Sequence, residues 1–406
     1  MPTFDVAIVG GGPAGSTCAW KLRQAGMKVV VVDRAVFPRD KVCAGWITPQ
    51  VMADLELDED DYRHGRRFQA FTGFRVGVIG AARDIDTIYG QPISVGIRRC
   101  EFDHYLLERS GARLQLGNAV SSLRRDGGVW TINDALRAPM LVGAGGHFCP
   151  VSQFLNGSPR APQLVAAQEG EFPIDSDARS TAAAPELPEL FFSRDLKGYG
   201  WCVRKQDYVN VGFGHLSDRG VRESSAEFAS FLHKRGRIPS QWMSRWRGHA
   251  YLLSIPPHRK VIDDGVLLAG DAAGLAYPQS GEGIRPAIES GLMAAETILE
   301  AHEAYSQAAF ESYDARLRSR FGSSGLSTLA ANVVPAQLGV TLGLFLLRQP
   351  QFVRHIVLNR WFLHAQEPPL TASGTTTGRA RLSGALPERM QTPTRSSTAA
   401  SRHRSA

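Results

Sequence analysis

Two short apolar runs frame the N-terminal part of the chain. Residues 4–9 and 27–32 consist mostly of apolar side chains, which is typical of strands buried on both faces. Between them, residues 13–25 have the apolar spacing of a helix, and Gly26 follows as a helix-ending residue. The pattern therefore predicts a strand–helix–strand unit whose second strand ends at Asp33.

Farther along the chain the pattern changes. Residues 163–216 form short alternating segments separated by turn residues, which indicates an antiparallel meander, whereas residues 50–95 show no clear periodicity. The other predicted elements are a helix at 101–111, short strands at 117–120 and 129–133, a strand within 138–146, a helix at 223–236, a buried strand within 265–274, a helix at 283–301 and mainly helical structure over 303–365.

These elements predict an α/β fold in which a Rossmann-like, nucleotide-binding domain is interrupted by an antiparallel sheet. The inserted sheet would supply the substrate side of the protein, and a C-terminal helical region would follow. The boundaries we assign are 1–150 and 261–302 for the two parts of the nucleotide-binding domain, 151–260 for the inserted sheet, 303–365 for the helical region and 366–406 for a basic tail that we expect to be disordered.

Charge argues against a nucleic acid partner. The chain of 406 residues has a formal charge of +7, but residues 366–406 alone carry six Arg against two Glu. The rest of the chain is therefore close to neutral for its size. It also lacks a basic stripe with interleaved aromatic residues, so we expect no binding to nucleic acid.

Cysteine usage and the absence of targeting patterns indicate a cytoplasmic protein. The five cysteines are scattered, without a C-x-x-C pair, which argues against a disulfide framework and predicts no metal site. The first residues lack the pattern of a secretory signal, and no apolar run reaches the length of a spanning helix. No pattern indicates the oligomeric state.

A glycine-rich turn joins the first predicted strand to the first helix. Gly10, Gly12 and Gly15 have the G-x-G-x-x-G spacing, which allows a tight turn, close approach of a pyrophosphate and close packing of helix on strand. Asp33 ends the second strand, where a carboxylate would accept the ribose hydroxyl groups. The motif predicts a dinucleotide site formed by Gly10, Gly12, Pro13, Ala14, Gly15, Asp33 and Arg34.

A second glycine-rich turn indicates which dinucleotide is bound. In "VLLAGDAAG", Gly270 and Asp271 end a buried strand, and the segment resembles the second fingerprint of FAD enzymes, in which Asp271 would bind the ribityl chain. Gly281, Gly283 and Ile284 then stand at a helix start, whose positive dipole end would lie near the flavin pyrimidine. We therefore predict FAD as the cofactor.

The order of short motifs resembles that of the geranylgeranyl reductase family of FAD-dependent oxidoreductases, within the hydroxylase-like flavoprotein superfamily. Besides the glycine turns, the resemblance rests on "FPRDKVCAG", "RRCEFD" and "GYGWCVRK", and it covers roughly residues 4–320. That family saturates prenyl C=C bonds with reduced FAD as hydride donor. The resemblance implies a glutathione-reductase-type FAD-binding fold and adds to the cofactor site Lys41, Cys43, Ala44, Gly45, Arg99 and Val120.

The resemblance also implies which residues act on a substrate. Cys43 would lie near the isoalloxazine as a proton donor or a pocket-shaping group, since a thiol of pKa ~8.5 keeps its proton at neutral pH. Small buried packing is the ordinary alternative for a free cysteine. Tyr199 and Trp201 share one strand face with Val203 and would form an aromatic wall. The implied partners are a lipophilic, prenyl-type substrate and either NADPH or reduced ferredoxin as electron donor.

Two departures from the family pattern change what the resemblance implies. Gly145 stands where the superfamily often has an aspartate, which weakens a monooxygenase interpretation and leaves the electron donor undecided, and Val203-Arg204 replaces the usual Phe-Pro at the end of the strand. An FAD-dependent monooxygenase or halogenase is the first alternative, because "GYGWCVR" is similar to a halogenase signature, although it contains a single Trp. A non-catalytic electron-transfer flavoprotein is the second alternative.

An apolar stretch precedes a basic segment in the predicted helical region. Residues 333–347 are nearly all apolar, and Arg348, Arg354 and Arg360 follow at intervals. The stretch is too short to span a bilayer as a helix. It fits either a buried helix pair or a peripheral contact with the inner face of the membrane, where a lipophilic substrate would enter.

Overall fold

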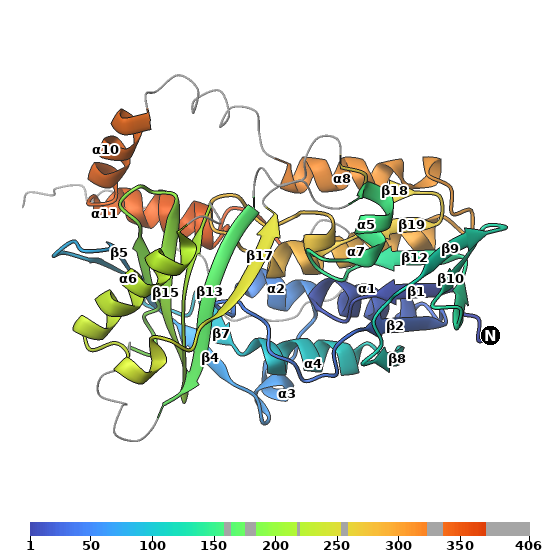
Figure 1. Ribbon diagram of the computed structural model, residues 1–406, viewed down its shortest axis with the longest axis horizontal. Coiled ribbons are helices and arrows are strands. Elements are labelled where there is room, and N and C mark those ends of the chain that lie inside the picture. Colours follow the sequence, from blue (N-terminus) through green and yellow to red (C-terminus); the bar gives the residue numbers. More distant parts are fainter. Residues whose placement is uncertain (158–163, 175–183, 217–219, 253–258, 323–335, 371–406) are drawn as a thin grey trace, which may run out of the picture. The chain divides into compact units, whose positions relative to one another are not determined.

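The structure is a computed structural model, and it describes residues 1–157, 164–174, 184–216, 220–252, 259–322 and 336–370 (Figure 1). The start of the predicted apolar stretch, at 333–335, and the greater part of the predicted basic tail, at 371–406, lie outside the described residues. Within the described part, the helices and strands form a mixed α/β fold.

A six-stranded sheet contains the predicted strand–helix–strand unit. Its central strand β1 pairs in parallel with β2 on one side and with β12 on the other, and all three consist almost entirely of buried residues. Strands that are covered by helices are buried on both faces, which explains why residues 4–9 and 27–32 are mostly apolar. The strands, in spatial order, are β18 (Ile262–Asp263), β19 (Val266–Leu268), β12 (Met140–Gly143), β1 (Val6–Val9), β2 (Val29–Asp33) and β8 (Arg113–Leu116).

A seven-stranded sheet is built mostly from the chain between β12 and β18. It contains the predicted meander, but β14 pairs in parallel with β5, so the sheet is not purely antiparallel. The remaining strands form two three-stranded sheets. One sheet consists of β11 (Leu136–Ala138), β10 (Val129–Ile132) and β9 (Leu123–Asp126), and the other consists of β3 (Trp46–Ile47), β7 (Ser94–Ile97) and β4 (Phe68–Phe71). The seven strands, in spatial order, are β17 (Arg247–Leu252), β13 (Leu164–Pro173), β16 (Tyr208–His215), β15 (Gly198–Lys205), β14 (Glu189–Phe192), β5 (Gly73–Val78) and β6 (Ile85–Ile88).

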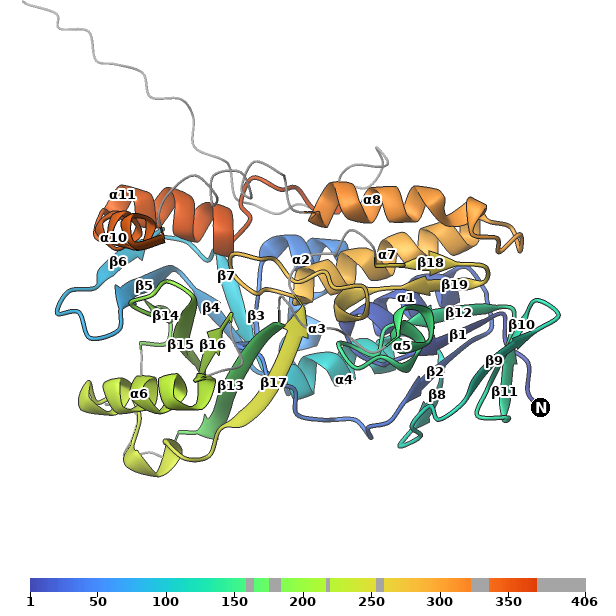
Figure 2. The same ribbon diagram turned by 45° about the horizontal axis from the view of Figure 1, so that its top comes forward.

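The helices pack around these sheets, as Figures 1 and 2 show. The final π-helical segment η5 packs against the seven-stranded sheet, where the ring of Phe362 lies against Phe192 and Tyr199, and the same ring also lies against Trp46 of β3. The helical elements are α1 (Pro13–Gln24), α2 (Pro49–Asp54), α3 (Glu59–Arg63), α4 (Arg99–Arg109), α5 (Pro150–Asn156), α6 (Val221–Lys234), η2 (Ser240–Trp242), η3 (Gly270–Ala272), α7 (Ile284–Glu300), η4 (Ala308–Phe310), α8 (Glu311–Phe321), α10 (Ala336–Leu346), α11 (Pro350–Phe352) and η5 (Val353–Phe362).

One sequence prediction is wrong in detail. The predicted strand at 117–120 does not form, because β8 ends just before Gly117, whose φ of 75° turns the chain and whose N–H donates to the carbonyl of Ala35 at 3.2 Å. Residues 49–97, most of which show no clear periodicity in the sequence, contain four strands and two short helices, each too brief for a periodicity to emerge. Strands β5 and β6 belong to the second sheet, while the proposed domain boundaries stay a prediction.

Helices α1 and α7 cross at very short distance. A Cβ placed on Gly291 of α7 would lie 2.4 Å from the carbonyl oxygen of Ala14 in α1. Only a glycine lets the two backbones approach this closely. The crossing brings the N-terminal ends of both helices to the same region of the protein.

We predict that Gly291→Leu lowers the free energy of unfolding by about 1–3 kcal/mol or more, since the added side chain must separate α7 from α1. Chemical denaturation followed by circular dichroism measures the loss. Glu296→Leu is the matched control, because Glu296 is exposed on the same helix. Its effect should stay within about 0.5 kcal/mol. Equal stability of the Gly291 variant and the control would show that the crossing tolerates a side chain.

Candidate functional site

A cavity of about 810 Å³ lies where the glycine turns, the 39–46 loop and the second sheet meet. Its wall contains nearly every residue that the sequence assigned to the cofactor or the reaction, although these residues come from seven separate stretches of the chain. The assigned residues that line this larger cavity are Gly12, Pro13, Ala14, Asp33, Arg34, Lys41, Cys43, Ala44, Gly45, Arg99, Tyr199, Trp201, Gly270, Asp271, Gly281, Gly283 and Ile284.

Three assigned residues lie outside the cavity wall. Gly10 and Gly15 shape the turn from beneath: a Cβ on Gly15 would lie 1.9 Å from the carbonyl oxygen of Gly10, so the third glycine is required for helix packing. Val120 packs against the core of the six-stranded sheet instead. It follows the turn at Gly117, and its assignment to the cofactor site stays a prediction.

The first glycine turn presents a helix N-terminus to the cavity. Gly12 precedes α1, whose opening residues Pro13 and Ala14 line the wall. Asp33 holds the turn in place, since its carboxylate accepts hydrogen bonds from the backbone N–H groups of Gly11 and Ala35, both at 2.8 Å. The positive end of the helix dipole therefore faces the cavity, where it favours an anionic group.

Hydrogen bonds from the second sheet hold the loop that carries Cys43. The side-chain amide of Asn210, in β16, donates to the carbonyl of Cys43 at 3.2 Å, and its oxygen accepts from the indole N–H of Trp201 at 2.7 Å. Sequence reasoning missed Asn210. Its signal is a polar residue inside the otherwise apolar, buried strand "YVNVGFGH", where an amide needs partners.

Arg99 stands beside Cys43 at the start of α4. Its guanidinium donates two hydrogen bonds to Asp103, both at 2.8 Å, and it interacts with the Cys43 thiol. Burial acts to lower the pKa of Arg99, but Asp103 and Cys43 outweigh it and raise the pKa further above its usual value. Asp103 also pairs with Arg39 at 3.3 Å. Arg99 thus keeps a positive charge next to the thiol, with one carboxylate already opposing it.

Two histidines that the sequence analysis did not single out lie near Lys41. The Lys41 ammonium is 2.5 Å from Nε2 of His249, and burial is the main reason that the Lys41 pKa is lowered. Burial, followed by the charge of Lys41, lowers the pKa of His249 to about 3, so its imidazole is neutral and can accept this hydrogen bond. The pKa of His147 is also lowered, mainly by burial. Asp271 is the anionic group facing both Lys41 and His147.

Buried charges lie behind the Cys43 loop. Gly45 has a φ of 66°, and a Cβ there would lie 2.5 Å from the Lys205 ammonium. Lys205 in turn pairs with Glu171 at 2.9 Å. Burial raises the pKa of the neighbouring Glu169 to about 7. The glycine after Cys43 is therefore needed both for backbone conformation and for space.

A second, smaller cavity of about 270 Å³ adjoins the larger one. Tyr199, Trp201 and Gly281 line both cavities, so the aromatic face predicted on β15 is the wall between them. The other lining residues are mostly apolar and come from the second sheet and its loops, from the loop before α7 and from the C-terminal helical region: Val165, Phe192, Leu196, Lys197, Gly198, Gly214, His215, Leu216, Pro278, Gln279, Gly343, Leu347, Phe352 and Trp361.

The larger cavity fits a dinucleotide such as FAD. Its volume lies in the range of cofactor-sized pockets. Its wall runs from Asp33, at the end of β2, past the N-terminus of α1 and the cations Arg39 and Lys41, to the aromatic side chain of Trp201. The Asp33 carboxylate would suit the ribose hydroxyl groups of the cofactor. The end of α1 and the two cations would suit its pyrophosphate, and the Trp201 ring would suit its ring system.

Comparisons with known proteins agree with this fit. A geranylgeranyl diphosphate reductase from Rhodobacter capsulatus is 28% identical over 327 residues, covering 73% of this chain and 75% of the relative. A menaquinone reductase from Mycolicibacterium smegmatis is 28% identical over 336 residues, covering 72% and 76%. These matches confirm the resemblance that the sequence motifs indicated.

Solved structures share the fold. A geranylgeranyl bacteriochlorophyll reductase-like protein from Thermoplasma acidophilum superposes with a TM-score of 0.68 at 20% identity, over 90% of this chain and 98% of that one. PqsL from Pseudomonas aeruginosa, described as a probable FAD-dependent monooxygenase, superposes with a TM-score of 0.62 at 20% identity, over 85% and 100%. The FAD binding domain family model matches residues 3–323. This chain therefore belongs to the FAD binding domain family of flavoproteins.

Proposed function

We propose that this protein is an FAD-dependent reductase that saturates C=C bonds of a lipophilic, prenyl-type substrate. The observation that carries the proposal is the smaller cavity, which is mostly apolar and meets the larger cavity at Tyr199 and Trp201. A hydrocarbon chain in the smaller cavity would reach the cofactor ring without crossing water. The names of the reductase relatives support this substrate class.

Reduction of an alkene needs a hydride at one carbon and a proton at the other, and reduced FAD, when bound, would supply the hydride. Cys43 is the group that we propose as proton donor, because its thiol lies on the wall of the larger cavity. Asn210 holds the loop through the Cys43 carbonyl. After the proton leaves, the neighbouring Arg99 guanidinium would stabilise the thiolate.

An FAD-dependent monooxygenase or halogenase is the second candidate, because PqsL shares the fold over most of this chain. The two candidates differ in their use of oxygen. A third candidate, an electron-transfer flavoprotein without a substrate, leaves the apolar smaller cavity without a role. The cavity therefore favours an enzyme.

We predict that substrate reoxidises the reduced flavin without oxygen, and that Cys43→Ser slows this step by about 10²-fold or more, since a hydroxyl is a much weaker acid than a thiol. Anaerobic stopped-flow absorbance measures the step, with geranylgeranyl diphosphate and menaquinone as probes. Reoxidation that depends on oxygen would favour the monooxygenase instead. Full activity of Cys43→Ala would show that the loop only shapes the cavity.

We also predict that Asp271→Ala is purified largely without FAD. Loss of one charge-assisted hydrogen bond to the ribityl chain would remove about 1.5–3 kcal/mol of binding free energy. This corresponds to about 10- to 150-fold in the dissociation constant. Flavin absorbance per chain measures retention, and Asp263→Ala, on the edge strand β18, is the control. A fully yellow Asp271 variant contradicts the ribityl assignment.

Helix α10 has one side at the smaller cavity and another side exposed to solvent, as we expect where a lipophilic substrate enters from a membrane. Gly343 lines the smaller cavity, and so does Leu347 just beyond the helix, whereas the side chains of Leu342 and Phe345 are 56% and 57% exposed. Exposed Arg348 follows the helix. Within the described residues, no helix combines the length and apolarity needed to cross a bilayer. We propose a peripheral contact, in which apolar side chains enter the interface beside basic ones.

We predict that the protein sediments with phosphatidylglycerol vesicles at low salt and that binding weakens as salt rises. Leu342→Glu combined with Phe345→Glu should reduce the bound fraction severalfold, and Arg348→Glu combined with Arg354→Glu should reduce it as well. Phe154→Glu is the control, because Phe154 is 54% exposed on α5. Vesicle binding that is indifferent to the α10 substitutions would contradict the proposed entrance.

A further inference from the structure

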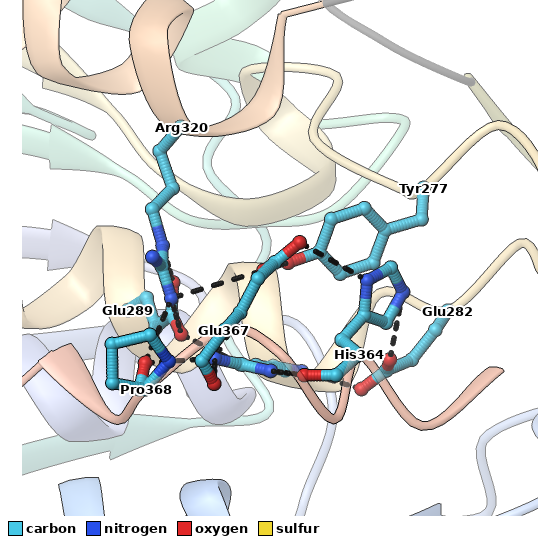
Figure 3. A network of polar contacts seen from close by, with 8 residues as sticks. Tyr277, Glu282, Glu289, Arg320, His364, Glu367 and Pro368 are labelled. Atoms are coloured by element: carbon cyan, nitrogen blue, oxygen red, sulfur yellow. Dashed lines mark hydrogen bonds and ion pairs between the residues drawn. The ribbon is translucent and has the colours of Figure 1, made fainter. Parts of the chain in front are cut away.

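A buried group of ionisable side chains lies behind one end of the larger cavity (Figure 3). Glu282 stands between Gly281 and Gly283, in the loop that lines this cavity and leads into α7. Its side chain is only 6% exposed. Figure 3 shows its carboxylate directed toward His364, in the segment that follows η5.

His364 stands between two carboxylates. Its Nε2 is 4.0 Å from Oε2 of Glu282, and its Nδ1 is 3.3 Å from Oε1 of Glu367. The imidazole stacks on the ring of Tyr277, with ring centroids 3.8 Å apart, and its side chain is 6% exposed. Glu367 is 38% exposed. Glu282, His364 and Glu367 thus form a row of titratable groups that leads from the cavity wall to solvent.

Nearby arginines are committed to other partners. Arg285 donates to Glu289 at 2.7 Å, and Arg320 donates to both oxygens of Glu289 at 2.7 and 2.8 Å. Arg285 meets Glu282 only through its backbone N–H, at 3.3 Å from Oε1. Among the described residues, neither Oε2 of Glu282 nor Nε2 of His364 has a hydrogen-bond partner. No strong contact therefore holds the Glu282 carboxylate permanently ionised.

Glu282 is consequently poised to change charge near neutral pH. Burial raises its pKa to about 7, against the opposing charges of His364 and Arg285, while Glu289 adds to the increase. Tyr277 and Glu367 are the other ionisable groups of the cluster. Burial raises the Tyr277 pKa, so the phenol stays neutral. The Glu367 pKa is lowered despite burial, because His364 donates to it and the two arginines lie nearby.

Resting on the proposed function, we infer that Glu282 is a proton-uptake site linked to the redox state of the flavin, and that His364 and Glu367 connect it to solvent. If a reduced nicotinamide is the electron donor, its oxidation by hydride transfer would add one negative charge to the bound flavin. One solvent proton, added to the Glu282 carboxylate, gives the neutral acid. The site then gains no net charge.

Electrostatics gives the direction of this coupling. The helix end at Gly283 and Ile284 lines the larger cavity, where it would favour negative charge on the flavin. An ionised Glu282 beside it would oppose that charge, whereas a neutral Glu282 would not. His364 can accept a proton at one ring nitrogen and release another from the second, as an imidazole between two carboxylates does. Protonation of Glu282 therefore favours reduction of the flavin.

The test measures the midpoint potential of the bound FAD against pH by spectroelectrochemistry, without substrate. We expect the pH dependence above about pH 7 to correspond to about two protons per electron pair in the wild type and about one in Glu282→Gln. Glu296→Gln, an exposed glutamate on α7, is the matched control and should behave like the wild type. Identical pH dependence in Glu282→Gln and the wild type overturns the inference.

A second measurement does not depend on the variant binding FAD. The reduced-minus-oxidised infrared spectrum of the wild type should show a new protonated-carboxyl band that shifts in D₂O, and its absence overturns the inference. His364→Gln should retain the band but slow its appearance severalfold, and unchanged kinetics would remove His364 from the route. Because both measurements omit the alkene, their outcome is separate from the reductase test.

Discussion

Close contact between backbones is the constraint on which the rest of this protein depends. Gly15 lets α1 pack directly over the turn at Gly10, and Gly291 lets α7 cross α1 at a distance that no side chain would permit. The crossing places the start of α1 and the start of α7 at one cavity, with Gly12 and Gly283 both on its wall. The positive ends of two helix dipoles therefore lie at the same cavity, where they favour an anionic group.

The second sheet completes the cavity from the opposite side. Trp201 lines both cavities while its indole N–H binds Asn210, which in turn binds the carbonyl of Cys43. The strand that forms the aromatic wall is therefore linked to the loop that presents the thiol. Because these groups are buried, each lost hydrogen bond would leave a polar atom without a partner, which keeps the loop in one conformation.

The buried cations around the cavity are each opposed by a carboxylate. Arg99 is opposed by Asp103, Lys205 by Glu171, and Arg285 by Glu289. Glu282 differs because its contacts with cations are weaker, so burial raises its proton affinity. A carboxyl group with such a raised proton affinity can take up a proton when negative charge is added nearby. It would therefore help a neighbouring cofactor to accept electrons.

The sequence by itself determined the elements whose signal is local. The strand–helix–strand unit, the glycine turns with Asp33 and Asp271, and the aromatic face of β15 follow from spacing and apolar pattern over a few residues, and the structure brings most of the assigned residues to one cavity. Tertiary structure decided what depends on distant partners. The pairing of β5 with β14, the support of Cys43 by Asn210, and the meeting of Glu282 with His364 join residues that are 80 or more positions apart. No local pattern encodes such pairs, because burial and hydrogen bonding act on positions in space rather than on neighbours along the chain.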